Sequence, residues 1–212
     1  MAYQSVTGVT KTERVVEKSR FLTYVVHAEG EAEARVALDR IRAEHPLATH
    51  VCWAYIADKT GNEQRFSDDG EPQGTAGMPI LNVIKAQKLF EVLVAVVRYF
   101  GGIKLGAGGL VRAYSASAAE GCNAAPKKLF GRCVECSVRV DYPQTDAALR
   151  FLAGARCEVL SQEYGMQAVY TVAVREEEFS AFSAKLKDYL NGKAEIFENN
   201  RYFYPFALEN RE

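Results

Sequence analysis

Apolar residues are most concentrated near the middle of the chain, in the unbroken run Val92–Val97. A run of this kind is typical of a central strand that is buried on both faces. After Gly101 and Gly102 the pattern changes to a helical period, with apolar or small residues at three- and four-residue intervals from Leu110 to Gly121. The pattern predicts a buried strand, a glycine-rich loop and a helix with a small-residue face, in that order.

The first half of the chain mixes the two periods that an α+β domain requires. Alternation of apolar and polar residues predicts strands at 12–18, 21–27, 50–56 and 63–66. A 3.6-residue period predicts helices at 30–45 and between residues 75 and 87. Residues 1–12 show neither period clearly, and we expect them to be loosely held.

The second half follows the order strand, helix, strand, strand, helix, strand. These elements are expected at 133–142, 145–153, 157–164, 167–175, 176–190 and 194–203. The order is that of the split β-α-β, or ferredoxin-like, arrangement. Pro126, two lysines and Gly131 interrupt the periodic patterns. We therefore expect an N-terminal domain at 1–126, a linker at 127–132 and a C-terminal domain at 133–212.

Composition and charge limit the class of protein. A formal charge of −1 gives no general attraction to nucleic acid or to an anionic membrane, so any such binding requires a local patch. No run approaches the roughly 18 apolar residues of a membrane helix, and the N-terminus lacks the apolar region of a secretory signal. Five cysteines, an odd number in a chain of 212 residues, indicate reduced thiols. We expect a cytoplasmic protein with no membrane partner.

The glycine-rich segment after the buried strand is a candidate anion or nucleic-acid site. Glycines before a helix let a ligand approach the unpaired amides of the helix N-terminus, and basic side chains add charge-assisted bonds to phosphate. The spacing matches neither the Walker A loop nor the dinucleotide fingerprint. Tight packing of the strand against the helix explains the glycines equally well. The candidate residues are Arg98, Tyr99, Gly101, Gly102, Lys104, Gly106, Gly108, Gly109 and Arg112.

An acidic loop at 66–75 precedes this segment, and its candidate residues are Ser67, Asp68, Asp69 and Glu71. Its carboxylates could hold Mg²⁺ through water, pair with the basic residues at 98–112, or form turns. We expect the loop and the glycine-rich segment to form opposite walls of one site. No histidine lies at metal-ligand spacing and no nucleophile has a visible base, so we assign no metal ligand, no catalytic residue and no cofactor.

Two long motifs, RFSDDGEPQGTAGMPIL and VVRYFGGIKLGAGGLVRAYSASA, closely resemble those of the Impact family. The resemblance implies an N-terminal domain of the ribosomal-protein and ribonuclease-PH superfold, like the fourth domain of elongation factor G. It also implies a ferredoxin-like C-terminal domain similar to that factor's fifth domain. Eukaryotic members restrain a translation-initiation-factor kinase and carry a further interaction domain, whereas this chain resembles the two-domain bacterial type.

Three functional hypotheses follow. The first is a cytoplasmic binding protein linked to translation or its regulation, which contacts RNA, the ribosome or a translation factor. The second is a Mg²⁺-dependent enzyme acting on a phosphorylated small molecule or nucleotide. The third is a protein-interaction module in which the glycines are purely structural. We favour a non-enzymatic role, and the sequence carries no pattern that sets an oligomeric state.

Overall fold

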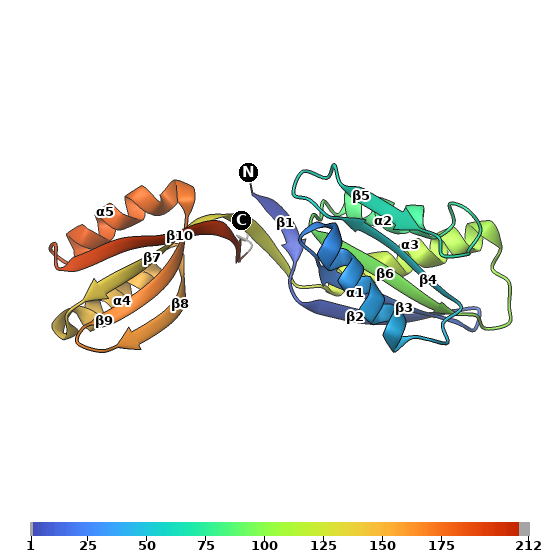
Figure 1. Ribbon diagram of the computed structural model, residues 1–212, viewed down its shortest axis with the longest axis horizontal. Helices are drawn as coiled ribbons and strands as arrows, with labels where there is room; N and C mark the ends of the chain where they lie inside the picture. Colours follow the sequence, from blue (N-terminus) through green and yellow to red (C-terminus); the bar gives the residue numbers. More distant parts are fainter. Residues whose placement is uncertain (1, 208–212) are drawn as a thin grey trace. The chain divides into compact units, whose positions relative to one another are not determined.

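The computed structural model describes residues 2–207, which form two compact α+β units (Figure 1). The first unit spans Tyr3–Lys128 and the second begins at Leu129. Each unit has its own sheet and its own buried core. Within residues 2–207, no helix is both long and apolar enough to cross a lipid bilayer.

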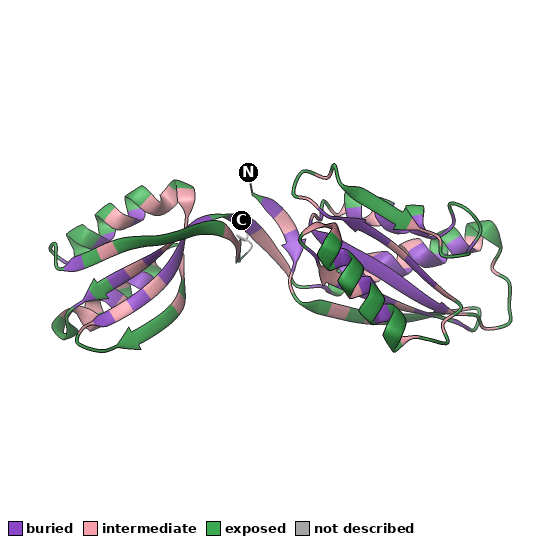
Figure 2. Ribbon diagram, in the orientation of Figure 1, coloured by how far each residue is buried: buried purple, intermediate pink, exposed green. Residues whose placement is uncertain are grey.

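The main sheet of the first unit has five antiparallel strands in the order β2-β3-β6-β4-β5. The strands are β2 (Val9–Val16), β3 (Ser19–His27), β4 (His50–Ile56), β5 (Gln64–Ser67) and β6 (Val92–Tyr99). The central strand β6 has 0% exposure at every position from 92 to 97, and Figure 2 shows the buried residues gathered in the inner strands. The prediction of a buried central strand is confirmed.

Three helices cover both faces of this sheet. The helix α1 (Gly30–Glu44) packs on one face, whereas α2 (Gly77–Ala86) and α3 (Gly106–Ala124) pack on the other. Because successive side chains of a strand point to opposite faces, Val94 contributes to the core under α2 and α3 and Leu93 to the core under α1. This double cover explains why the strand has no polar face.

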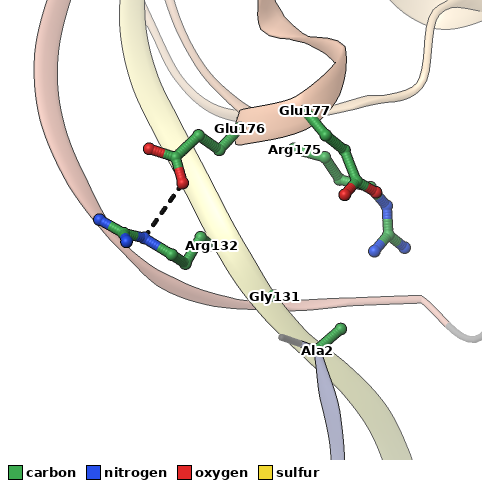
Figure 3. A pocket seen from close by; sticks show the side chains of 6 residues that line it. All are labelled: Ala2, Gly131, Arg132, Arg175, Glu176 and Glu177. Carbon is green, nitrogen blue, oxygen red and sulfur yellow. Dashed lines mark ion pairs between the residues drawn. The ribbon is translucent and has the colours of Figure 1, made fainter.

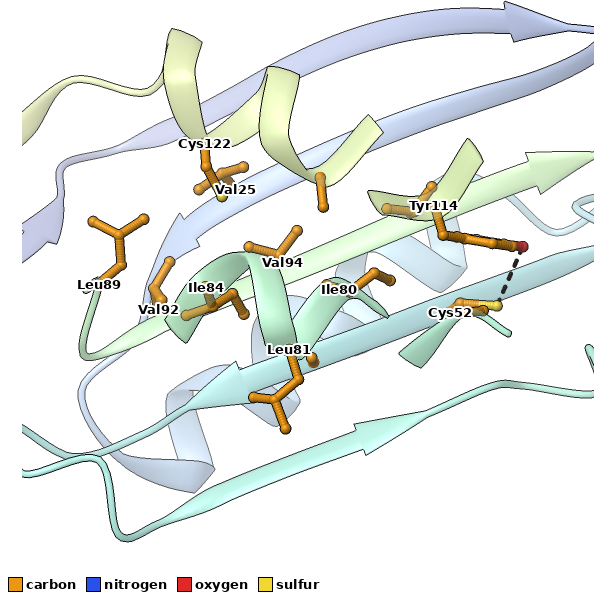
Figure 4. Close-up of a cluster of buried hydrophobic side chains, with 14 of the residues drawn as sticks. Val25, Cys52, Ile80, Leu81, Ile84, Leu89, Val92, Val94, Tyr114 and Cys122 are labelled. Atoms are coloured by element: carbon orange, nitrogen blue, oxygen red, sulfur yellow. Dashed lines mark hydrogen bonds between the residues drawn. The ribbon is translucent and has the colours of Figure 1, made fainter. Parts of the chain in front are cut away.

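Figure 4 shows the larger of the two cores. Ile80 and Ile84 of α2 and Tyr114 and Cys122 of α3 enclose Val94 of the central strand. Small residues let α3 lie close to the sheet: a Cβ atom at Gly121 would lie 2.6 Å from Thr23 Cγ2. The helix predicted from the pattern that begins at residue 110 is therefore confirmed, and its small-residue face packs on the sheet.

The expectation that residues 1–12 are loosely held is wrong. Residues Tyr3–Val6 form strand β1, in which Tyr3 and Val6 are buried. The Tyr3 hydroxyl donates a hydrogen bond to the Glu91 carboxylate. This contact joins residues 88 positions apart, so no local pattern could have predicted it.

The second unit has the ferredoxin-like arrangement, as predicted. Its four long strands take the order β10-β7-β9-β8, and two helices supply one face of the buried core. The elements are β7 (Lys127–Val140), α4 (Thr145–Gly154), β8 (Cys157–Tyr164), β9 (Ala168–Arg175), α5 (Phe179–Tyr189) and β10 (Ala194–Phe206). Short 3₁₀ turns, Tyr142–Gln144 and Glu176–Glu178, precede the two helices.

The expected linker at 127–132 is instead the first part of strand β7. The end of β10 pairs with it: Phe206 lies opposite Leu129 and Tyr202 opposite Cys133. This ladder satisfies the backbone N–H and C=O groups of the segment. The local proline, lysines and glycine give no indication of this pairing. The strand thus continues across the boundary between the two units.

Candidate functional site

The motifs singled out in the sequence converge at one end of the first sheet. There β3 and β4 begin and β6 ends, so that Arg20 lies opposite Tyr99 and His50 lies opposite Arg98. The acidic loop after β5 also reaches this end, since the His50 Nδ1 atom donates to the Asp69 carbonyl at 2.8 Å. The sheet therefore brings together residues that are far apart in the chain.

Arg98 is buried rather than presented to a ligand. It is 5% exposed, and its Nη1 atom donates to Glu71 Oε1 at 2.6 Å. Its Nη2 atom lies 3.3 Å from Ser19 Oγ, and its guanidinium stacks over the rings of Phe21 and Phe100. The charge is neutralised inside the protein, so we remove Arg98 from the candidate phosphate ligands.

Glu71 is the centre of a buried polar network. Its Oε1 atom also accepts a hydrogen bond from the Tyr114 hydroxyl at 2.8 Å, and that hydroxyl lies 3.3 Å from Cys52 Sγ. Burial raises the pKa of the Cys52 thiol to about 12 and raises the pKa of Tyr114 as well. Both groups stay protonated at neutral pH, so neither is an activated nucleophile.

Asp68 holds the acidic loop to the start of α2. Its carboxylate accepts backbone N–H groups of Gly74, Ala76 and Gly77, at 2.8, 3.0 and 2.8 Å. These bonds satisfy amides that would otherwise be unpaired at the helix N-terminus. Asp68 is therefore engaged within its own loop.

The neighbouring Asp69 is engaged as well. Its Oδ2 atom accepts the Val51 N–H at 2.7 Å, and its own N–H donates to Ser67 Oγ at 3.1 Å. Among residues 2–207, no group of three or more His, Cys, Asp or Glu side chains is arranged to hold a metal ion. The three loop carboxylates accept hydrogen bonds from backbone amides or from the Arg98 and Tyr114 side chains, which does not fit the Mg²⁺ hypothesis.

The glycines of the central motif divide into two kinds. A Cβ atom at Gly101 would lie 2.0 Å from the carbonyl carbon of Lys18, so this glycine allows the β2–β3 hairpin turn to pack on the loop. Gly109 is tight in the same way, with Leu105 Cβ at 3.0 Å. Gly106 has a φ of +68° and Gly108 is helical, and neither would place a Cβ atom within 4 Å of its surroundings. Close packing explains Gly101 and Gly109, whereas Gly106 and Gly108 lie at the open start of the helix.

A groove of about 520 Å³ lies between the β2–β3 hairpin and the start of α3, and the glycine that lines it is Gly109. Lys104 and Arg112 line it and are exposed, and neither has an ion-pair partner within residues 2–207. Arg14 adds a third cation, which also pairs with Glu120 at 2.8 Å. Leu105, the residue before α3, supplies no side-chain cap. The groove therefore places exposed cations beside the start of α3, where no side chain caps the helix.

The acidic loop is not the opposite wall of this groove. That wall is the β2–β3 hairpin, which contributes Arg14, Val16 and Glu17. Tyr99 is also elsewhere, with its hydroxyl 2.8 Å from His45 Nδ1 and its ring in the core under α1. The hairpin residues escaped prediction because an edge strand with alternating charges carries no sign of a ligand. The one sequence feature that could have indicated these residues is the turn between the strands expected at 12–18 and 21–27.

A second hollow, of about 240 Å³, lies in the other unit (Figure 3). Part of its charged lining is paired within the unit: Glu176 accepts from Arg132 at 3.1 Å and from Arg201, which lies outside the lining, at 2.9 Å. Cys133 and Cys136, which have the spacing Cys-x-x-Cys, lie in β7 and are buried and free. Neither feature competes with the groove as a ligand site.

Comparison with known proteins identifies similar sequences along the whole chain. Residues 17–122 match the Impact N-terminal domain, and residues 138–193 match a domain of unknown function (DUF1949). The IMPACT family member YvyE of Bacillus subtilis is 38% identical over 99% of this chain and 96% of its own length. The IMPACT family member YigZ of Escherichia coli is 34% identical over 85% of this chain and 90% of its own length.

More distant relatives and a solved structure agree with these matches. The Protein IMPACT homolog of Saccharomyces cerevisiae is 27% identical over 47% of this chain and 40% of its own length. A crystal structure described as that of a hypothetical protein aligns with a TM-score of 0.60 at 30% identity, covering 94% of this chain and 98% of the other. The two-unit organisation is thus shared beyond this chain.

Proposed function

The chain belongs to the IMPACT family, and from this premise we propose that it is an RNA-binding protein of the translation system. The site is the groove between the β2–β3 hairpin and α3. The observation that carries the proposal is the pair of exposed cations Lys104 and Arg112, which have no ion-pair partner among the described residues, beside the start of α3, where no side chain caps the helix.

Phosphate is the ligand group that this combination suits. A helix N-terminus presents backbone N–H groups with a positive dipole end, and nearby basic side chains supply charge-assisted bonds. Val16, Ile103 and Leu105 add apolar surface to the groove, which suits contact with ribose or a base. Most protein–nucleic acid hydrogen bonds go to phosphate and sugar, so a groove of this kind gives affinity with little sequence preference.

The buried network fixes the positions of the two walls of the groove relative to each other. Ser19 Oγ lies 3.3 Å from Arg98 Nη2 and accepts the Gly101 N–H at 3.1 Å. Ser19 begins β3, directly after the hairpin turn, whereas Gly101 begins the loop that leads to Lys104. Arg98 therefore serves the site as a positioning residue.

Salt-dependent RNA binding tests the proposal. Fluorescence anisotropy with a labelled single-stranded RNA should give an affinity that falls roughly twenty- to fortyfold between about 50 and 200 mM salt, for three phosphate contacts. The variant Lys104→Ala/Arg112→Ala should bind more weakly at low salt. Its salt slope should fall to that of roughly one contact.

The matched control is Arg40→Ala/Lys85→Ala, which removes the same charge from exposed positions on α1 and α2. It should keep the affinity and slope of the wild type. Equal losses in both double variants would mean that net charge, and not the groove, determines binding. No salt-dependent binding to single-stranded or hairpin RNA would overturn the proposal.

A further inference from the structure

A second open groove, of about 590 Å³, runs between α4 and α5 of the other unit. Its floor is aromatic: the Phe151 ring lies 5.8 Å from that of Phe182 and 5.4 Å from that of Tyr189. Phe182 is buried beneath the surface, whereas Tyr189 is 51% exposed at the end of α5. The groove thus offers apolar surface to the solvent along a helix pair.

Small residues keep this groove open. Gly154 ends α4, and a Cβ atom there would meet no other atom within 4 Å. Ala155 and Ala181 also line the groove. Since the residues of α5 that line the groove run from Ala181 to Tyr189, the groove is about 12 Å long at 1.5 Å per residue. That length matches two to three turns of a third helix.

The rim is basic although the unit is acidic. Residues 129–207 contain nine Lys and Arg against eleven Asp and Glu, yet three cations, Arg150, Arg156 and Lys185, line this groove. Glu178 is the one acidic residue of the lining, and it pairs with Arg156 at 3.2 Å. Within residues 2–207, Arg150 and Lys185 have no ion-pair partner. The groove therefore carries positive charge that the described residues do not neutralise.

We propose that the α4–α5 groove binds an acidic amphipathic helix of another protein. Apolar side chains of that helix would pack on Phe151 and Tyr189, and its carboxylates would face Arg150 and Lys185, in the helix-in-groove mode. A small ligand would leave much of its surface in water in so open a groove, unlike the usual enclosed pocket. Successive nucleobases would need several flat exposed rings, whereas Phe182 is buried, Phe151 is half-buried and Tyr189 alone of the three is exposed.

The probe is a labelled synthetic helix of about four turns, with leucines on one face and glutamates on the other. The control peptide has the same leucines but carries lysines in place of the glutamates. With the full chain, anisotropy should show binding of the glutamate peptide only. Amide chemical shifts should change in α4 and α5. The variant Arg150→Glu/Lys185→Glu should weaken binding at least about tenfold, because attraction becomes repulsion.

Two further variants distinguish the groove from general effects. Gly154→Phe should block binding with little loss of stability, since Gly154 lines the groove and a Cβ atom there would meet no other atom within 4 Å. Lys187→Glu reverses a charge on the same helix outside the groove and should leave binding within about twofold. Lys104→Ala/Arg112→Ala should also leave peptide binding unchanged, which separates this proposal from that of RNA binding.

Three outcomes would overturn the proposal. The first is equal affinity for the glutamate and lysine peptides, which would indicate unspecific apolar contact. The second is a loss in Lys187→Glu as large as in Arg150→Glu/Lys185→Glu. The third is no binding of the glutamate peptide, with single-stranded RNA instead causing the shift changes in α4 and α5.

Discussion

Arg98 shows how burial determines the role of a residue. A basic residue directly after an apolar run, followed by glycines, is chemically suited to phosphate. The structure instead buries it and places Glu71 at 2.6 Å. A buried guanidinium requires a counterion because an unpaired charge is costly to remove from water. That counterion comes from a loop 27 residues earlier in the chain.

Removal of the Glu71 carboxylate should destabilise the first unit strongly. We expect Glu71→Leu to cost about 3–5 kcal/mol in the free energy of unfolding, because it leaves Arg98 buried and unpaired. Glu71→Gln should cost less, since the amide oxygen still accepts hydrogen bonds from Arg98 and Tyr114. Arg98→Met should restore part of the stability in the Glu71→Leu background. Urea unfolding measures all three.

The surface ion pair of Arg35 and Glu31 is the control for this series. Both side chains are in contact with water, so Arg35→Ala should change the urea midpoint little. If Glu71→Leu were as mild as Arg35→Ala, the buried pair would not be a stabilising centre of the site.

At the scale of elements, the periodic patterns located most helices and strands because packing on a core repeats with the element's own period. The helix expected at 30–45 spans Gly30–Glu44, and the strand expected at 157–164 is β8 exactly. The patterns missed the segments that become strands only by contact with residues distant in the chain. These segments are β1 and the start of β7. Gly101 shows the same limit, because its neighbour is a turn far away in the chain.

Two glycines of the same motif should respond in opposite directions to alanine. Gly101→Ala should destabilise the protein by about 1–3 kcal/mol or more, because its Cβ atom would overlap the Lys18 carbonyl. Gly108→Ala should stabilise it by about 0.5–1 kcal/mol, because the site is helical and open. Thermal and urea unfolding test both. Similar effects of the two changes would contradict the division of glycines into packed and open.

At the scale of the whole molecule, the two units carry separate cores and separate candidate sites. The groove proposed for RNA lies in the unit of Tyr3–Lys128, and the α4–α5 groove lies in the unit that begins at Leu129. Their chemistry differs, since the first places cations beside a helix start and the second combines cations with aromatic rings. The two proposals therefore predict two different partners.

Separate cores predict separate unfolding. In hydrogen-exchange mass spectrometry of the full chain, Glu71→Leu should accelerate exchange in β3, β6 and α3, whose residues surround the first core. Exchange in β9 and α5 should keep its wild-type rate, because those elements belong to a different core. Equal acceleration in both units would show that they unfold as one cooperative body.

The sequence by itself determined the α+β class, the ferredoxin-like order of the second half and the buried central strand, because local period follows from burial on one or two faces. It also marked the residues that gather at one end of the first sheet. Only the tertiary structure decided which of them face solvent. Lys104 and Arg112 are exposed and have no ion-pair partner in the part of the chain that the structure describes, whereas Arg98, Asp68, Asp69 and Glu71 are paired inside the protein. Pairing and burial depend on residues distant in the chain, and no local pattern encodes them.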